Sequence, residues 1–303
     1  MQKNVKKGIF LALLAAALYA INAPFSKLLL DFMPPTLMAG VLYLGAGVGM
    51  SAVALVRRVR GIEQERALSR AELPYTILMI VLDIAAPIFL LIGLSYTTAA
   101  HAALLNNFEI VATAAIAFLV FRERVSPRLF VGIVFVVAAC FLLSFEDIGA
   151  LRFSKGSLFV LLAALCWGLE NNCTRKLSAK DPLQIVLLKG VFSGLGSVVI
   201  GLLIGERFGV WWSVPAVLGV GFVAYGLSIF FYVYAQRLLG AARTSAYYAV
   251  APFIGAVLSL LIFRILPGPL YLAALALMAV GAWLSSGDGP LLKRKKGASA
   301  PTR

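Results

Sequence analysis

Ten long apolar runs determine what this chain can fold into. They lie at roughly 8–29, 36–56, 73–94, 97–121, 128–145, 156–174, 184–205, 212–235, 241–263 and 268–286. Each is close to the about 20 residues with which a helix crosses a bilayer, and together they occupy nearly all of the 303 residues. With 61% apolar and 13% charged residues, a water-soluble globular enzyme is close to excluded. We therefore expect an all-α integral membrane protein with ten transmembrane helices.

Lysine and arginine are distributed unevenly between the segments that connect these runs. With the N-terminus inside the cell, 21 of the 27 Lys and Arg residues fall on inner segments and 4 on outer segments. Lys27 and Lys189, placed near helix ends, are left out of this comparison. Because positive charge is enriched on the cytoplasmic side, we expect a multi-pass protein of the inner (plasma) membrane with both termini in the cytoplasm. The net charge of +14 then reflects topology and contact with anionic lipids, and no nucleic acid partner is expected.

The first five runs resemble the last five at a nearly constant offset. A shift of 148 residues places Gly8 on Gly156 and Tyr19 on Trp167, a shift of 149 places Gly45 on Gly194, and a shift of 142 places Phe121-Arg122 on Phe263-Arg264. We therefore predict two five-helix repeats, at 1–150 and at 151–303, the second with a basic C-terminal tail. Because five is odd, the second repeat enters the membrane from the opposite side. Inverted repeats of this kind are the architecture of secondary transporters, with the site at the repeat interface.

Two further features point to a known family. Each repeat opens near a pair of one aromatic and one small residue, Tyr19-Ala20 and Trp167-Gly168, and the segment 93–126 runs from Gly93-Leu94-Ser95-Tyr96 to Phe121-Arg122-Glu123. In these respects the chain resembles the drug/metabolite transporter superfamily, specifically its ten-helix EamA-type branch. The resemblance covers almost the whole chain. It implies the ten-helix carrier fold and a substrate among the amino acids, metabolites and drugs that this superfamily exports.

The chain departs from the family pattern at two positions. The pattern has a proline in the fourth helix of each repeat and a glutamate at the end of that helix. The first repeat has Glu123 but carries Ile110 at the proline position, and the second has Pro252 but carries Ile265 at the glutamate position. The position of Glu123 between two arginines indicates a role in orientation or loop structure.

Two acidic residues lie near the middle of predicted helices. An ionisable group at membrane depth is costly and usually faces a cavity or a partner, so both Asp83 and Glu109 are candidate sites for a proton or a substrate amine. Asn106 and Thr113, three residues before and four after Glu109, should share its helix face. The alternative for each acid is a structural hydrogen bond between helices.

Other polar and aromatic residues form a weaker group of candidates. Asn22 and Glu170 occupy matching positions in the two repeats and can both line a central cavity, although Glu170 can instead pair with a nearby Lys or Arg at the cytoplasmic end. His101, the single histidine, can act as a proton sensor or as a polar anchor; its counterpart Arg243 can hold a carboxylate. Tyr225 and Tyr248 can form a cavity wall that carries hydroxyl groups. Trp211 and Trp212 are interpreted as an interfacial belt.

The sequence contains no signature of catalysis. It has no GxxxxGK[ST] loop and no HExxH motif, and its three cysteines lie in apolar runs without paired spacing. We expect no metal, cofactor or ATP-driven engine. The preferred function is a secondary transporter that exports small amphipathic metabolites, amino acids foremost. Three alternatives remain open: a multidrug or other metabolite carrier, an intramembrane lipid-modifying enzyme that would use Asp83 and His101, and a channel.

Glu109 is the preferred residue for coupling. Burial disfavours a charged carboxylate, whereas a bound ammonium favours it, so such a group could exchange a proton for a cationic substrate. We also expect the cavity to be lined by helices 1, 3, 4, 6, 8 and 9, because helices 2, 5, 7 and 10 are nearly all apolar. Substrate identity, coupling ion, direction and oligomeric state stay open.

Overall fold

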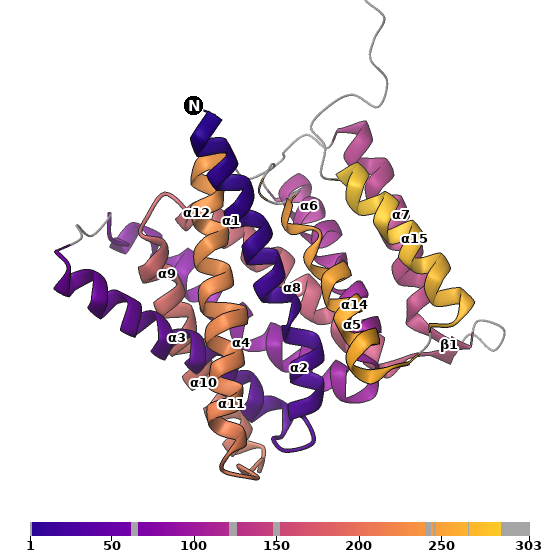
Figure 1. Ribbon diagram of the computed structural model, residues 1–303, viewed down its shortest axis with the longest axis horizontal. Coiled ribbons are helices and arrows are strands. Elements are labelled where there is room, and N and C mark those ends of the chain that lie inside the picture. The colour runs from indigo at the N-terminus through magenta and orange to yellow at the C-terminus, as the bar shows by residue number, and fades with distance from the viewer. Residues whose placement is uncertain are drawn as a thin grey trace, which may run out of the picture.

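The computed structural model describes residues 2–61, 66–120, 126–147, 152–239, 244, 247–265 and 267–285. Within these residues the chain is a bundle of helices with one short hairpin (Figure 1). The elements of the first half are α1 (Gln2–Ala20), α2 (Asn22–Leu29), α3 (Pro35–Val59), the 3₁₀ turn η1 (Arg70–Glu72), α4 (Leu73–Tyr96), α5 (Ala99–Leu105), α6 (Phe108–Leu119), α7 (Pro127–Ser144) and β1 (Phe145–Asp147). Those of the second half are β2 (Arg152–Phe153), α8 (Lys155–Leu177), α9 (Pro182–Leu188), the π-helical turn η2 (Lys189–Ser193), α10 (Gly194–Leu203), α11 (Ser213–Gly221), the π-helical turn η3 (Phe222–Leu227), α12 (Ser228–Leu239), α14 (Ala251–Phe263) and α15 (Pro269–Ser285).

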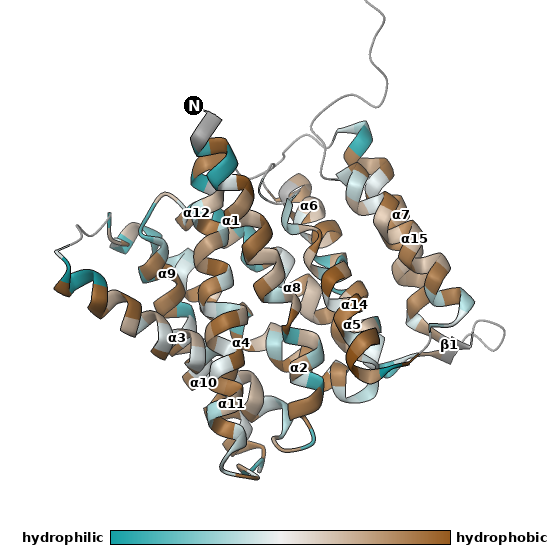
Figure 2. Cartoon of the chain, viewed as in Figure 1, coloured by the Kyte–Doolittle hydropathy of each residue, from teal (hydrophilic) through white to brown (hydrophobic). Residues whose placement is uncertain are grey.

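The helices confirm the membrane architecture expected from the apolar runs. Within the residues that the structure describes, eight helical segments are long and apolar enough to cross a membrane, and two shorter apolar helices, α14 and α15, correspond to the ninth and tenth runs. The outward faces of the helices are apolar, and polar residues gather mostly near helix ends and in loops (Figure 2). Leu261, for example, is 68% exposed and Leu203 is 80% exposed. Such a surface is stable in lipid and not in water.

The helix contacts repeat when the two halves are exchanged. The contact of α4 with α8 has its counterpart in the contact of α12 with α1, because exchanging the halves turns one into the other. In the same way, the contact of α6 with α8 has its counterpart in that of α14 with α1. Three further contacts map onto themselves: α3 with α10, α5 with α14, and α7 with α15, the last forming a pair at one side of the bundle (Figure 1). The packing is therefore that of two duplicated halves facing one another.

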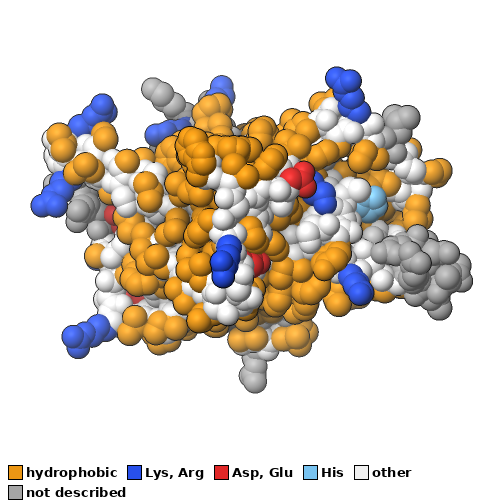
Figure 3. Space-filling model, turned by 90° about the horizontal axis from the view of Figure 1, so that it is seen from below, with side chains coloured by type: hydrophobic (Ala, Val, Ile, Leu, Met, Phe, Trp, Pro, Cys, Tyr) orange, Lys and Arg blue, Asp and Glu red, His pale blue; other side chains and the backbone are white. Residues whose placement is uncertain are grey.

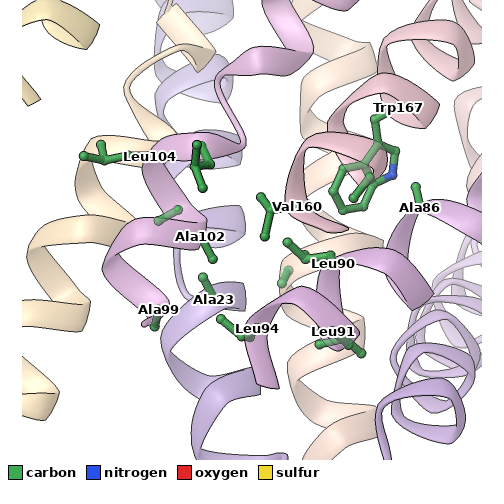
Figure 4. Packing of buried hydrophobic residues seen from close by; sticks show 14 of the residues in the cluster. Ala23, Ala86, Leu90, Leu91, Leu94, Ala99, Ala102, Leu104, Val160 and Trp167 are labelled. Carbon is green, nitrogen blue, oxygen red and sulfur yellow. The ribbon is translucent and has the colours of Figure 1, made fainter. Parts of the chain in front are cut away.

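Small residues allow the two halves to approach closely. At the crossing of α4 and α8, a Cβ on Gly93 would lie 2.8 Å from the carbonyl oxygen of Gly156, and a Cβ on Gly156 would lie 2.8 Å from the Cβ of Thr97. Glycine at both positions brings the backbones together, which is how helices associate in lipid. Beside this crossing Leu90, Leu94 and Val160 fill the interior, with Ala102 of α5 (Figure 4).

Contacts between loops show which segments share an end of the bundle. At the N-terminal end, Lys180 forms an ion pair with Glu72 at 3.2 Å, and the backbone N–H of Asp181 donates to the carbonyl of Arg66. At the opposite end, the ring of Phe32 packs on Trp212 with centroids 4.7 Å apart. Trp211 is 82% exposed there, a position suited to the headgroup region. Two of the segments predicted to be inner thus meet at one end of the bundle, and two of those predicted to be outer meet at the other.

Candidate functional site

A buried ion-pair cluster joins the two halves in the interior of the bundle. Lys189 of η2 lies with its Nζ 2.5 Å from Glu170 Oε1 of α8 and 3.2 Å from Asp83 Oδ2 of α4, and all three side chains are at most 4% exposed. Tyr43 of α3 donates its hydroxyl to Asp83 Oδ1 at 2.9 Å, and Thr174 donates to Glu170 Oε1. We call Lys189, Asp83 and Glu170 the Lys189 cluster.

The position of Lys189 corrects two expectations. Lys189 is not near a helix end: it lies seven residues into the span Pro182–Leu203, about 10 Å along the axis at 1.5 Å per residue. A π-helical turn begins at Lys189, and such turns occur frequently at functional sites. Among the described residues, Glu170 forms its ion pair with this buried lysine and not with a basic residue near the end of its helix.

A second polar group surrounds Asn22. The helix of the first span breaks at Ile21, so that Asn22 is the first residue of α2. Its Nδ2 donates to the hydroxyl of Tyr225 at 2.9 Å, and its Oδ1 accepts from Ser26 at 3.0 Å. Tyr225 in turn packs against Tyr43 with ring centroids 4.9 Å apart. This places two of the sequence candidates, Asn22 and Tyr225, directly beside the Lys189 cluster.

Glu109 forms a third polar group with an asparagine of the other half. Asn171 of α8 donates its Nδ2 to Glu109 Oε1 at 2.5 Å and lies 3.5 Å from Thr113 Oγ1. Glu109 and Asn171 are half-buried, unlike the sealed Lys189 cluster. Glu109 is still close enough to Glu170 and Lys189 to interact with them electrostatically.

The expected common face of Asn106, Glu109 and Thr113 is not formed. The helix is interrupted at Asn106 and Asn107, where backbone N–H groups bond three residues back, as in Glu109 N–H to Asn106 C=O at 3.0 Å. This turn sends Asn106 towards Tyr19, whose hydroxyl lies 3.4 Å from Asn106 Nδ2. Glu109 and Thr113 remain on one face and share Asn171.

Tyrosines connect the three groups. Successive ring centroids lie 4.9 Å apart for Tyr43 and Tyr225, 6.0 Å for Tyr225 and Tyr19, 6.0 Å for Tyr19 and Tyr248, and 4.8 Å for Tyr248 and Tyr232. We call these five residues the tyrosine row. It runs from the sealed cluster to Tyr19 and Tyr248, both half-buried and within electrostatic range of Glu109.

A small cavity lies where helix breaks meet. Its walls include Ala20 and Asn22 at the first break, Asn106 at the second, and Ala251 and Pro252 at the start of α14. The volume of about 20 Å³ is enough for about one water molecule. Asn106 is 8% exposed and its Oδ1 has no hydrogen-bond partner among the residues that the structure describes. The centre is therefore polar but closed, and a substrate could enter only if the halves moved.

His101 lies apart from these groups. It follows the N-cap of α5, where its Nδ1 is 2.7 Å from Thr98 Oγ1, and its ring packs on Tyr271 at 5.1 Å. Together with Lys27, whose Nζ donates to the carbonyl of Leu94 at 2.5 Å, it lines a cavity of about 210 Å³ at the end opposite the N-terminus. The histidine is visible on that face in Figure 3. His101 and Asp83 do not form a pair.

Three functional candidates were missed by the sequence reasoning: Lys189, Tyr43 and Asn171. Two of them come from helices 2 and 7, which were left out of the expected cavity lining; the small cavity itself is lined by residues of helices 1, 3, 4 and 9. A lysine within an apolar run was the available signal for Lys189. Tyr43 and Asn171 carried no comparable signal. Glu123 and Arg243 lie outside the described residues.

Comparison with protein families gives a match in both halves. The model of the EamA-like transporter family matches residues 6–145 and 154–287. An uncharacterized transporter of Methanothermobacter thermautotrophicus is 27% identical over 275 residues, which is 85% of this chain and 79% of that protein. The uncharacterized transporter YyaM of Bacillus subtilis is 24% identical over 184 residues, 55% of this chain and 58% of that protein.

The fold also has a counterpart among solved structures. One crystal structure superimposes with a TM-score of 0.65, covering 92% of this chain and 97% of the other at 18% sequence identity. At this identity the likeness concerns the fold alone.

Proposed function

Because the chain belongs to the EamA-like transporter family, we propose that it is a secondary carrier that exports small amphipathic metabolites, amino acids foremost, by alternating access of its two halves. It is a multi-pass membrane transporter and not an enzyme. A location in the plasma membrane with both termini in the cytoplasm is part of the proposal, supported by the distribution of basic residues.

One observation carries the proposal: the polar centre between the halves contains more acid than base. Among the described residues, Asp83, Glu109 and Glu170 are within electrostatic range of one lysine, Lys189. An uncompensated charge is costly inside a membrane protein. Protons or a cationic ligand must therefore supply the missing positive charge, which favours a substrate that carries an ammonium group.

The surroundings of Glu109 suit such a substrate. Glu109 and Asn171 present a carboxylate and an amide, and Tyr19 and Tyr248 offer aromatic faces and hydroxyl groups nearby. All four side chains are half-buried. This combination fits the ammonium and the side chain of a small amphipathic molecule, because pockets of this kind are mostly apolar with a few placed polar groups.

The proposed exchange takes place at Glu109. Burial favours the protonated acid, and an arriving ammonium favours the carboxylate. Binding of the amine would release the proton, and release of the amine on the other side would allow a proton to bind. The carrier would then run on a proton gradient without ATP.

Counterflow in proteoliposomes tests the proposal. Vesicles loaded with an unlabelled amino acid should accumulate the labelled one from outside, with saturation, and the panel should include a lipophilic cation as the multidrug alternative. Flux without saturation would indicate a channel, and a chemically altered product would contradict the transporter assignment. Glu109→Gln should keep the fold but lose the pH dependence of flux. Glu206→Gln is the matched control: Glu206 lies at the end of the bundle opposite the N-terminus, and this variant should retain the pH dependence of flux. Wild-type pH dependence in Glu109→Gln would refute the role of Glu109.

A further inference from the structure

The charges of the Lys189 cluster do not balance. One ammonium faces two carboxylates, and the three side chains are at most 4% exposed, so no water screens them. If both acids were ionised, the sealed cluster would carry one net negative charge, which costs several kcal/mol in such surroundings. A neutral cluster contains one proton on one of the two acids.

The hydrogen bonds indicate which acid holds this proton. Glu170 Oε1 accepts from Lys189 at 2.5 Å and also from Thr174, so it is the better stabilised carboxylate. Asp83 Oδ1 accepts from Tyr43, whereas its Oδ2 lies 3.2 Å from Lys189 and has no hydrogen-bond partner within the described part of the chain. Asp83 is therefore the less stabilised carboxylate and the acid that holds the proton.

The two contacts of Lys189 differ in what they connect. Lys189 and Glu170 belong to the second half, so their ion pair is preserved when the halves move relative to one another. Asp83 belongs to the first half, so its contact with Lys189 spans the interface. Within the described part of the chain, the other titratable groups in electrostatic range of the cluster are Tyr43, Tyr225 and Cys173 together with Glu109, and none of these supplies a second cation.

We propose that Asp83 binds a second proton, distinct from the one exchanged for substrate at Glu109, whose binding and release control the movement of the halves, and that Lys189, anchored on Glu170, is the internal counter-ion that neutralises Asp83 when this proton leaves. This step takes place when movement of the halves admits water to the cluster: the O–H bond of Asp83 breaks and the proton passes to that water, while Lys189 keeps all its protons and moves towards Asp83. The ion pair across the interface becomes stronger and holds the halves together. Protonation of Asp83 weakens the pair and frees the halves to rock. This inference rests on the proposed carrier function and adds a protonation site that controls the movement of its two halves.

Infrared spectroscopy of the purified protein in nanodiscs tests the proton without any substrate. A protonated carboxyl group gives a C=O stretching band separate from the amide bands. Asp83→Asn should remove one carboxylic-acid equivalent of this band near neutral pH. Glu170→Gln should also remove one, because Lys189 and an ionised Asp83 then balance each other. Lys189→Met should add one, because both acids then remain without a cation. Glu206→Gln, whose carboxylate accepts two backbone N–H groups, should leave the band unchanged.

Distance measurements between spin labels test the coupling to movement. Arg58 in the first half and Ala179 in the second are exposed, and labels there, with the three native cysteines replaced by alanine, report on the separation of the halves. Wild type should shift its distance distribution when the pH is lowered, and Asp83→Asn should show the low-pH distribution at every pH. Asp83→Asn and Glu170→Gln each leave a neutral or near-neutral cluster, so both variants should fold.

The outcomes separate this inference from the proposed function. An unchanged band in both Asp83→Asn and Glu170→Gln, or a distance distribution that responds neither to pH nor to Asp83→Asn, would overturn the inference. If both readouts follow the expectation but no amino acid shows counterflow, the proton site at Asp83 stands and the proposed substrate class fails. If pH-dependent counterflow is found while the band does not change, only the inference fails.

Discussion

Replacing Lys189 by methionine should be among the most destabilising single changes in this protein. Methionine has a similar length but no charge, so the substitution removes two ion pairs, at 2.5 Å and 3.2 Å, without leaving a large cavity. Deleting one partner of a buried pair costs about 3–5 kcal/mol, because the remaining charge stays buried without compensation. In this variant Asp83 and Glu170 can each take up a proton, so the loss of stability is smaller at low pH. The variant should therefore be least stable at high pH and recover as the pH falls.

Thermal unfolding in detergent, followed across a pH series, measures this effect. We expect the apparent Tm of Lys189→Met to fall by on the order of 10 °C at alkaline pH and by less in acid. The matched control is Lys180→Met, which removes a lysine that also lies 3.2 Å from a carboxylate, that of Glu72, but with about a fifth of each side chain exposed. A pair that is open to solvent in this way contributes little to stability, because water and salt screen it. The control should hardly change the Tm.

A combined variant identifies the origin of the loss. Lys189→Met with Asp83→Asn and Glu170→Gln has no buried charge in the cluster, and replacing a whole buried ion pair by neutral groups is often close to neutral in stability. The triple variant should recover most of the lost Tm and lose the pH dependence. If Lys189→Met were no less stable than Lys180→Met, the cluster would not be a buried ion-pair network and the reasoning would be wrong.

Two further predictions concern packing and topology. Gly93→Ala places a Cβ 2.8 Å from the Gly156 carbonyl and should cost about 1–3 kcal/mol by overpacking, whereas Gly219→Ala meets nothing within 4 Å and should be neutral or slightly stabilising; equal Tm changes would contradict the close crossing of α4 and α8. A cysteine placed near Lys293 should be labelled by impermeant reagents only after the membrane is opened, because the basic tail is expected in the cytoplasm; labelling in intact cells would reverse the orientation.

Much of this fold was predictable because membrane helices obey few and strong rules. Run length gives the number of spans, and the offset between Gly8 and Gly156 gives the duplication. The symmetric contacts of the two halves then follow from repeating one five-helix unit. The predicted candidates Asp83, Asn22, Tyr225 and Glu109 were recognisable for the same reason, since polar groups at membrane depth are rare.

The arrangement of the site could not be read in the same way. Lys189 was set aside because the seventh run was taken to begin at 184, whereas the helix begins at Pro182 and buries the lysine. Asn106 was placed on the face of Glu109 because an unbroken helix was assumed. The adjacent Asn106 and Asn107 are themselves a signal for a break, since asparagine side chains compete for backbone hydrogen bonds. The pairing of Asn171 with Glu109 depends on how α8 packs against α6. The spacing of residues along one helix cannot predict such a contact between helices.

Glu206 offers a test of alternating access from the end opposite the N-terminus. Its carboxylate accepts the backbone N–H groups of Thr36 and Leu37 at the start of α3, at 3.2 Å and 2.7 Å, and thereby ties the second half to the first at that end. The ion pair of Lys180 with Glu72 ties the halves at the N-terminal end. If the halves rock about the centre, weakening one end should favour opening there, and weakening the other end should favour the reverse.

The cavity of about 210 Å³ at the Glu206 end reports which end is open. Ser259 lines this cavity and is 2% exposed, so a cysteine at this position reacts with a small water-soluble thiol reagent only when that end opens. Hydrogen bonds to a charged group contribute about 1.5–3 kcal/mol. Glu206→Gln keeps one acceptor oxygen but loses the charge and the second acceptor, so we expect a loss of about 1 kcal/mol and about fivefold faster labelling. Lys180→Met should slow the same reaction by a smaller factor. Acceleration by both variants would mean that they merely loosen the protein, and the rocking of two halves would have to be abandoned as the mechanism.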